Sequence, residues 1–146
     1  MPFSSKDFAT TSAILESELP GRLVHRDVRQ RFHGGFSQER GHGVAIVDLP
    51  SRSISVTIGH LKEGQRTRLH RHNYETIIYV VKGCGYSLVE NEKVEWKAGD
   101  ALYVPVWAWH RHVNTGDDEA EYVACENAPL LQNLDIALRE EAPIND

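Results

Sequence analysis

The chain has 146 residues, with 16 lysines and arginines against 21 aspartates and glutamates, and a formal net charge of −5. This length suits one domain with a sizeable core. The acidic balance offers no basic patch, so neither nucleic acid nor an anionic membrane surface is an expected partner. No apolar run approaches the roughly 20 residues that a membrane-spanning helix needs.

The N-terminus and the cysteines bear on the compartment. The chain begins Met-Pro-Phe-Ser-Ser-Lys-Asp-Phe, which lacks the charged start and apolar core of a signal peptide. Cys84 and Cys125 are too few and too far apart for a disulfide framework, which suits a reducing compartment. A cytoplasmic protein is therefore expected.

Residues 1–21 are predicted to be an N-terminal arm. Ser4 or Ser5 suits the cap of a short helix that reaches about Leu19, just before a Pro-Gly pair would end it. Residues 22–146 are expected to form a single domain, because the sequence shows no repeat, linker or low-complexity segment.

From Arg22 onward the sequence consists of short β-rich runs. Glycines, prolines and Asn-Glu pairs separate these runs at short intervals, which is typical of an antiparallel sandwich or barrel. The segment 130–139 has helical apolar spacing and is expected to form either a short helix or a strand-like arm. The predicted strands lie at residues 44–47, 53–58, 76–81, 86–89, 94–96, 101–104 and 122–125.

Three histidines have the spacing of metal ligands. Residues two apart on a strand point to the same face, so His70 and His72 can offer both imidazoles to one point. His110 on a facing strand would complete a three-point clamp that leaves other coordination positions open. Such open positions are useful only if a substrate or another ligand binds in them.

Glycines, a proline and an asparagine stand at fixed distances from these histidines. The two segments read Gly64-x5-His70-x-His72 with Gly83 downstream, and Gly99-x5-Pro105-x4-His110-x3-Asn114. They resemble the two motifs of the cupin superfamily. This resemblance implies an all-β fold, the cupin-type double-stranded β-helix or jelly-roll barrel, with its motif region at residues 64–114.

One departure concerns the fourth metal ligand. Cupins of this kind usually carry a glutamate four residues after the second histidine, where this chain has Thr76, and Glu75 stands one place early. A one-residue offset in a strand turns the side chain to the opposite face. The expectation is a three-histidine site, with Glu75 or Thr76 as a possible fourth ligand or a residue behind the ligands.

Two short sequences carry a more specific likeness: His-Arg-His at 70–72 and Trp107-Ala-Trp109-His110-x-His112. They resemble the corresponding segments of the gentisate-type ring-cleaving dioxygenases. The resemblance implies ferrous iron held by three histidines without the motif glutamate. It is local, because those enzymes usually carry two cupin domains in a much longer chain.

Three further residues are candidates for substrate contacts. His112 shares strand parity with His110, so it is predicted either to point inward as a base or substrate contact or to lie at the rim. Arg68 shares parity with His70 and suits a substrate carboxylate, the alternative being a solvated charge. Trp107 is expected either to stack on a flat substrate or to pack in the core.

The leading functional hypothesis is a non-haem iron dioxygenase-like enzyme acting on a small chelating aromatic, dicarbonyl or carboxylate substrate. One divalent metal ion per chain is expected, with Fe(II) favoured and Zn, Mn or Ni as alternatives. The rival readings are a non-redox cupin isomerase or lyase and a non-catalytic ligand-binding cupin. Exposed sheet edges, and an arm such as residues 22–48 that could pair with a neighbour, lead us to expect a homodimer.

Overall fold

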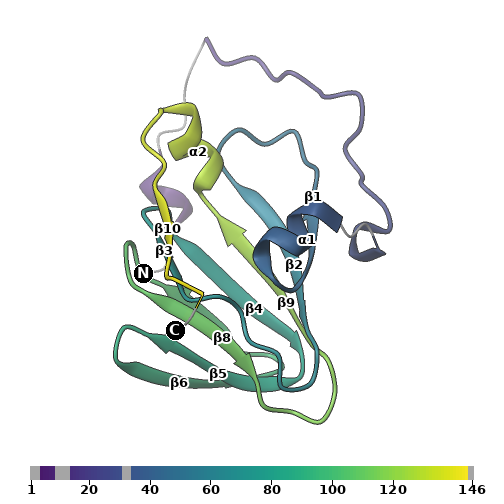
Figure 1. The fold of residues 1–146 in the computed structure, drawn as a ribbon. Coiled ribbons are helices and arrows are strands. Elements are labelled where there is room, and N and C mark those ends of the chain that lie inside the picture. The colour runs from purple at the N-terminus through teal and green to yellow at the C-terminus, as the bar shows by residue number, and fades with distance from the viewer. Residues whose placement is uncertain (1–3, 9–13, 31–33, 145–146) are drawn as a thin grey trace.

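The computed structural model describes residues 4–8, 14–30 and 34–144, which form two five-stranded antiparallel sheets (Figure 1). The first sheet contains, in spatial order, β1 (Gly43–Val47), β2 (Ser55–Leu61), β9 (Ala120–Glu126), β4 (Thr76–Lys82) and β7 (Ala101–Val104). The second contains β10 (Arg139–Glu141), β3 (His70–His72), β8 (His110–Asn114), β5 (Cys84–Val89) and β6 (Glu92–Lys97). The all-β prediction is confirmed.

Few helices accompany the sheets. They are η1 (Ser5–Asp7) and η2 (Val28–Gln30), both 3-10 turns, and the α-helices α1 (Gly34–Arg40) and α2 (Ala128–Asn133). The segment 130–139 was expected to form either a short helix or a strand-like arm. Both are present near it, because the helix α2 is followed by the short strand β10. Within the ranges that the structure describes, no helix is long and apolar enough to cross a membrane.

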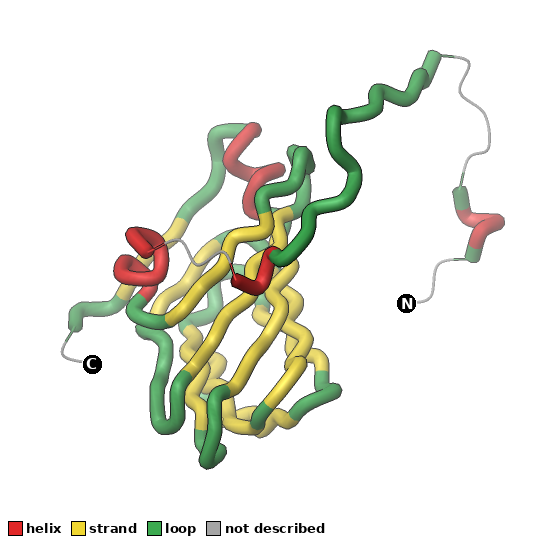
Figure 2. The backbone as a smooth tube through the Cα atoms, turned by 90° about the vertical axis from the view of Figure 1, so that its right-hand side faces the viewer, coloured by secondary structure: helices red, strands yellow, loops and turns green. Residues whose placement is uncertain are grey.

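The predicted N-terminal helix to Leu19 is wrong for the residues that are described. Ser4 does act as a cap, but only for the single turn η1, and residues 14–20 have no helical structure (residues 9–13 lie outside the description). Ile14 and Leu15 are 89% and 85% exposed, so no tertiary surface buries the apolar side chains. An isolated helix of this length is marginal in water. Figure 2 shows this segment leading away from the strands.

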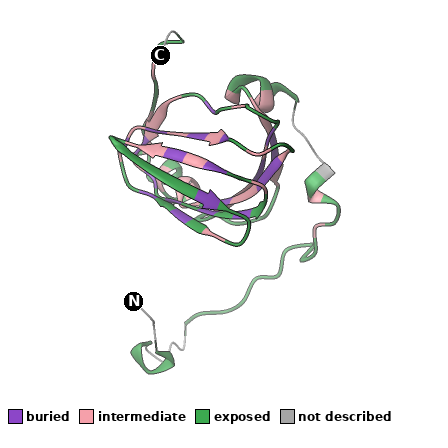
Figure 3. Cartoon of the chain, turned by 90° about the horizontal axis from the view of Figure 1, so that it is seen from below, coloured by how far each residue is buried: buried purple, intermediate pink, exposed green. Residues whose placement is uncertain are grey.

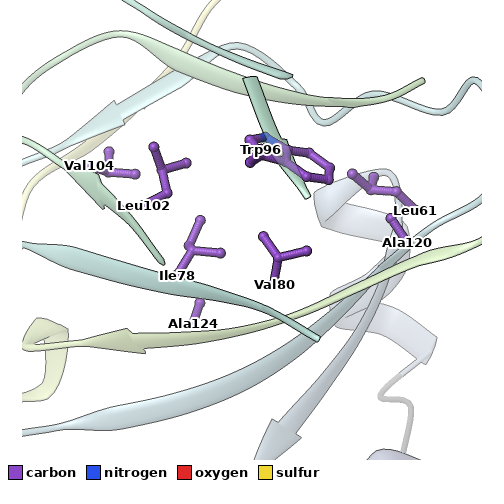
Figure 4. Close-up of a cluster of buried hydrophobic side chains, with 8 residues drawn as sticks. All are labelled: Leu61, Ile78, Val80, Trp96, Leu102, Val104, Ala120 and Ala124. Carbon is purple, nitrogen blue, oxygen red and sulfur yellow. The ribbon is translucent and has the colours of Figure 1, made fainter. Parts of the chain in front are cut away.

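The hydrophobic core lies between the two sheets. Burial alternates along β4 from Thr76 to Val80, which is the period expected of a strand with one face on the core. Figure 3 shows buried positions interrupted by exposed ones along the strands. The central cluster, drawn in Figure 4, consists of Leu61, Ile78, Val80, Trp96, Leu102, Val104, Ala120 and Ala124.

Strand β2 continues through Gly59, where the sequence had indicated its end. A Cβ at this position would collide with the ring of Tyr122, the residue directly opposite on β9. Gly59 therefore makes room for an aromatic side chain inside the sandwich and does not form a turn.

Candidate metal centre

Three histidine side chains converge on one point. Strands β3 and β8 are neighbours, and His70 stands directly opposite His110. One ring nitrogen from each of His70, His72 and His110 lies within 4.8 Å of the others. The side chains are sheltered, since His72 and His110 are 1% and 2% exposed. The predicted convergence of the imidazoles is thus present in the structure.

Backbone carbonyl groups set the tautomer of all three rings. A carbonyl oxygen only accepts hydrogen bonds, so each ring must carry its proton on Nδ1 and keep a lone pair on Nε2. Nε2 lone pairs are what a metal ion requires. The Nδ1 atoms of His70, His72 and His110 lie 2.7, 2.8 and 2.8 Å from the carbonyl oxygens of Arg68, Tyr74 and Ala108.

Burial keeps these imidazoles neutral. Desolvation lowers the pKa of His72 and of His110 to about 4 and lowers the pKa of His70 further, and the neighbouring His110 is a second, smaller cause for His70 and His72. At neutral pH the cluster therefore presents three uncharged nitrogen donors. This donor set fits a borderline divalent ion such as iron, zinc, manganese or nickel.

The two candidates for a fourth ligand differ in orientation. Glu75 is exposed and accepts a hydrogen bond of 2.9 Å from the Tyr103 hydroxyl, so it faces away from the histidines. Thr76 is buried and donates at 3.2 Å to the carboxylate of Glu126. Among the described residues, the group that could hold a metal contains the three histidines and neither of these side chains.

His112 points inward, as its parity with His110 indicated, but it carries its proton on the other nitrogen. Its Nδ1 lies 2.7 Å from Ser87 Oγ, and Trp96 Nε1 donates to the same oxygen at 2.9 Å. An indole N–H can only donate, so Ser87 Oγ accepts from Trp96. Ser87 is fully buried, and among the described residues the acceptor within reach of its own hydroxyl proton is His112 Nδ1, so we assign that proton to the bond with His112. His112 Nε2 then bears a hydrogen. The ring lines the same cavity as the three converging histidines, as a hydrogen-bond donor.

The histidines line a cavity of about 80 Å³ between the sheets. Three charged side chains that the sequence analysis did not single out also line it: Arg40, Glu126 and Arg139. The Nη1 atom of Arg40 is buried without a hydrogen-bond partner in the described structure. Arg139 donates to the Tyr74 hydroxyl at 3.2 Å, and burial raises the pKa of Glu126.

Little in the sequence marks these three residues. Arg40 closes the unpredicted helix α1, and Arg139 lies on β10, so each reaches the cavity only through tertiary folding. Glu126 has a weak signal. It continues the alternation that places Tyr122 and Ala124 on the inner side of β9, and all three line the cavity.

The sequence left two alternatives open for each of Arg68 and Trp107, and the structure places Arg68 at the cavity and Trp107 outside it. Residues 67–69 lie outside β3, so the parity argument fails there: Thr67 is buried, and Arg68 sits at the cavity rim, paired with Glu141 at 3.3 Å. Trp107 does not line the cavity. Its ring packs against the guanidinium of Arg71 at 4.4 Å.

Known proteins share this part of the chain. Residues 57–126 match the family model described as "Cupin domain". A 5-aminosalicylate 1,2-dioxygenase of Comamonas sp is 35% identical over 94 residues, which cover 64% of this chain and 24% of that protein. A gentisate 1,2-dioxygenase of Streptomyces sp is 33% identical over 75 residues, 51% of this chain and 21% of that protein.

A solved structure has the same fold. The salicylate 1,2-dioxygenase of Pseudaminobacter salicylatoxidans superposes with a TM-score of 0.65 at 23% identity, covering 70% of this chain and 32% of that one. This chain therefore spans only about a fifth to a third of the length of these proteins. The matching sequence segment, the two facing sheets and the histidine cluster together show that residues 57–126 form a cupin domain, with a resemblance to the gentisate-type dioxygenases.

Proposed function

We propose that the protein is a non-haem iron dioxygenase that opens the ring of a small hydroxylated aromatic carboxylate. The observation that carries this proposal is the group of three imidazoles, each with its Nε2 lone pair exposed to one point by a backbone hydrogen bond on the other side of the ring. The relatives named above, which act on ring-hydroxylated benzoates by their names, support the choice of substrate.

His70, His72 and His110 would hold one divalent ion per chain, with Fe(II) favoured over Zn, Mn and Ni. A ferrous ion would supply the redox chemistry by which dioxygen reacts with an aromatic ring. Three neutral ligands leave the full charge of the ion in the site, which favours a chelating anionic substrate. Both atoms of dioxygen enter the product as one ring carbon–carbon bond breaks, so the reaction consumes no external reductant.

The protein's own groups would orient the substrate. The unpartnered Nη1 of Arg40 and the guanidinium of Arg139 face the cavity and suit a carboxylate. The Nε2–H of His112 would donate to a substrate oxygen near the metal. The sandwich core behind His112 keeps bulk water away from this end of the cavity.

The test joins metal analysis with oxygen uptake. Protein loaded anaerobically with Fe(II) is expected to bind one ion per chain and to consume oxygen with gentisate, 5-aminosalicylate or salicylate. His72→Ala should lose both the metal and the uptake, whereas His25→Ala, which removes a histidine outside the cavity, should lose neither. Metal binding without oxygen uptake for all three substrates would contradict the proposal.

The same geometry favours one rival. Three histidine nitrogens with open positions also describe a zinc centre that polarises a substrate without redox chemistry. Under this reading, protein purified without added metal would carry zinc, manganese or nickel at one per chain. The aromatic acids would then bind without oxygen uptake. If the aromatic acids bind but are not changed chemically, with or without oxygen, the result would favour a non-catalytic ligand-binding cupin.

A further inference from the structure

A C-terminal segment outside the matched cupin residues 57–126 supplies a cavity arginine. Strand β10 begins with Arg139, which pairs directly opposite His72 on β3. Residues directly opposite each other in an antiparallel pair point to the same face of the sheet. The guanidinium of Arg139 therefore lies on the inner face with the imidazole, where it donates to the Tyr74 hydroxyl at 3.2 Å and lines the cavity.

The charge of Arg139 is close enough to act on the three imidazoles. The ring of Tyr74, whose hydroxyl binds the guanidinium, stacks on the ring of His72 with 3.9 Å between centroids and an angle of 2° between the planes. Burial is the largest cause of the low pKa of His70, His72 and His110, and the positive charge of Arg139 lowers each pKa further. The same charge attracts an anion bound at the histidines.

The register of β10 on β3 decides where this guanidinium lies. Strand β10 has three residues and stands at the edge of the second sheet, so its ladder provides few hydrogen bonds to hold its register. A slip of one residue would turn Arg139 to the outer face and bring Glu140 to the inner one. The ion pairs that join β10 to residues nearby are partly exposed, so each contributes little: Arg71–Glu140 and Arg68–Glu141.

Asn73, the residue that follows His72, holds the chain just before β10. Its side-chain Nδ2 donates to the carbonyl of Ile136 at 2.7 Å, and its Oδ1 accepts from the N–H of Leu138 at 2.8 Å. Its own backbone N–H donates to the Leu138 carbonyl at 3.2 Å. These bonds fix the main chain immediately before Arg139 relative to the histidine strand.

We infer that Asn73 is a positioning residue for the substrate. Its side-chain amide sets the register of β10 and thereby places the guanidinium of Arg139 where it binds the carboxylate of an aromatic acid. The inference rests on the proposed function for the carboxylate ligand. It adds that the preference for a carboxylate depends on an amide that does not itself line the cavity.

The test compares two chelating ligands, of which only one has a carboxylate. Salicylate and catechol are titrated by calorimetry into protein loaded with Zn(II), so that binding is measured without turnover. In Asn73→Ala, salicylate affinity is expected to fall about tenfold, the worth of a charge-assisted hydrogen bond, while catechol affinity is unchanged. Equal losses for both ligands, or no loss for salicylate, would overturn the inference and leave the proposed function standing. A wild-type protein that does not bind salicylate would contradict both proposals.

A double-mutant cycle shows whether Asn73 acts through Arg139. In an Arg139→Gln background, Asn73→Ala should cause no further loss of salicylate affinity, because both changes remove the same contact. A second loss of about tenfold in that background would contradict the inference. The zinc content should stay at one per chain in each variant, and loss of zinc from Asn73→Ala would show that the amide supports the metal ligands instead.

Asn133→Ala is the matched control. Its side-chain amide also ties the C-terminal part of the chain to a backbone carbonyl, that of Arg52 at 2.8 Å, but at the end of α2 and not beside β10. This variant should change neither affinity. The same loss for salicylate in Asn133→Ala would show that general loosening of the C-terminal segment, and not the register set by Asn73, governs the binding of the carboxylate.

Discussion

The four histidines on β3 and β8 differ in where the ring proton lies. His70, His72 and His110 donate from Nδ1 to main-chain carbonyls, whereas His112 accepts on Nδ1 from Ser87. Spacing along the strands could show that these rings share a face. It could not show the tautomer of His112, because that depends on partners brought together by the fold, Ser87 on β5 and Trp96 on β6.

Replacing Ser87 should release the His112 tautomer. In Ser87→Ala the ring loses the donor to Nδ1, so a population with the proton on Nδ1 is expected, together with a destabilisation of about 1–3 kcal/mol from the unpaired Trp96 N–H. Long-range ¹H–¹⁵N spectra of histidine-labelled protein would report the tautomers. Ser87→Thr keeps the hydroxyl and should give the wild-type pattern. A His112 signal that is unchanged in Ser87→Ala would show that the Ser87 hydroxyl does not set the His112 tautomer.

Acid should destabilise the metal-free protein through the buried imidazoles. The pKa values of His72 and His110 are about 4 in the folded chain against 6.5 ordinarily, so the unfolded chain takes up protons first as the pH falls. The free energy of unfolding therefore decreases from about pH 6.5 down to pH 4 and gains nothing from these groups above that window. Melting temperatures measured across this range should fall less steeply for His72→Gln than for the wild type; parallel curves would contradict this assignment.

At the scale of elements, the sequence was a good guide where turn residues bound a short β-rich run. Strand β4 was predicted as a mostly apolar run, although its burial alternates, and the turn glycines and proline around the motifs placed β3, β7 and β8. Elements without such signals were missed or misjudged. Helix α1 escaped notice, and the helix predicted up to Leu19 is absent from the described residues because no packing surface supports it.

Helix α1 matters because it delivers Arg40 to the cavity. Arg40→Gln should weaken salicylate binding to zinc-loaded protein by about tenfold or more, which is the usual worth of a charge-assisted hydrogen bond. Arg71→Gln is the matched control, since that guanidinium stacks on Trp107 away from the cavity. Calorimetry that shows equal losses in both variants would remove Arg40 from the binding site.

Strand β2 offers a direct check on the packing between sheets. Gly59→Ala forces a methyl group into the ring of Tyr122 and should lower the free energy of unfolding by about 1–3 kcal/mol. Gly35→Ala, where a Cβ meets nothing within 4 Å, should be neutral or slightly stabilising because alanine favours a helix. Denaturant titration of the metal-free proteins would measure both, and equal stabilities would contradict the close approach.

At the scale of the whole molecule, each of the two sheets has an edge strand on either side. The segment 43–47, part of the arm predicted to pair with a neighbour, instead pairs with β2 of its own chain, and it forms one border of the first sheet while β7 forms the other. Such borders are places where a second copy can add. The homodimer remains our prediction, to be checked by sedimentation equilibrium; a monomer mass at micromolar concentration would refute it.

The backbone carbonyls behind the three histidines have a consequence for how this site can change over time. Main-chain oxygens persist through any exchange of the residues that bear them, so replacing Arg68, Tyr74 or Ala108 leaves the proton acceptors in place. Substitution of the neighbouring side chains therefore leaves the orientation and the tautomer of the three imidazoles unchanged. Substitutions in the cavity walls can change which substrate binds, while the three histidines keep their capacity to bind a metal ion.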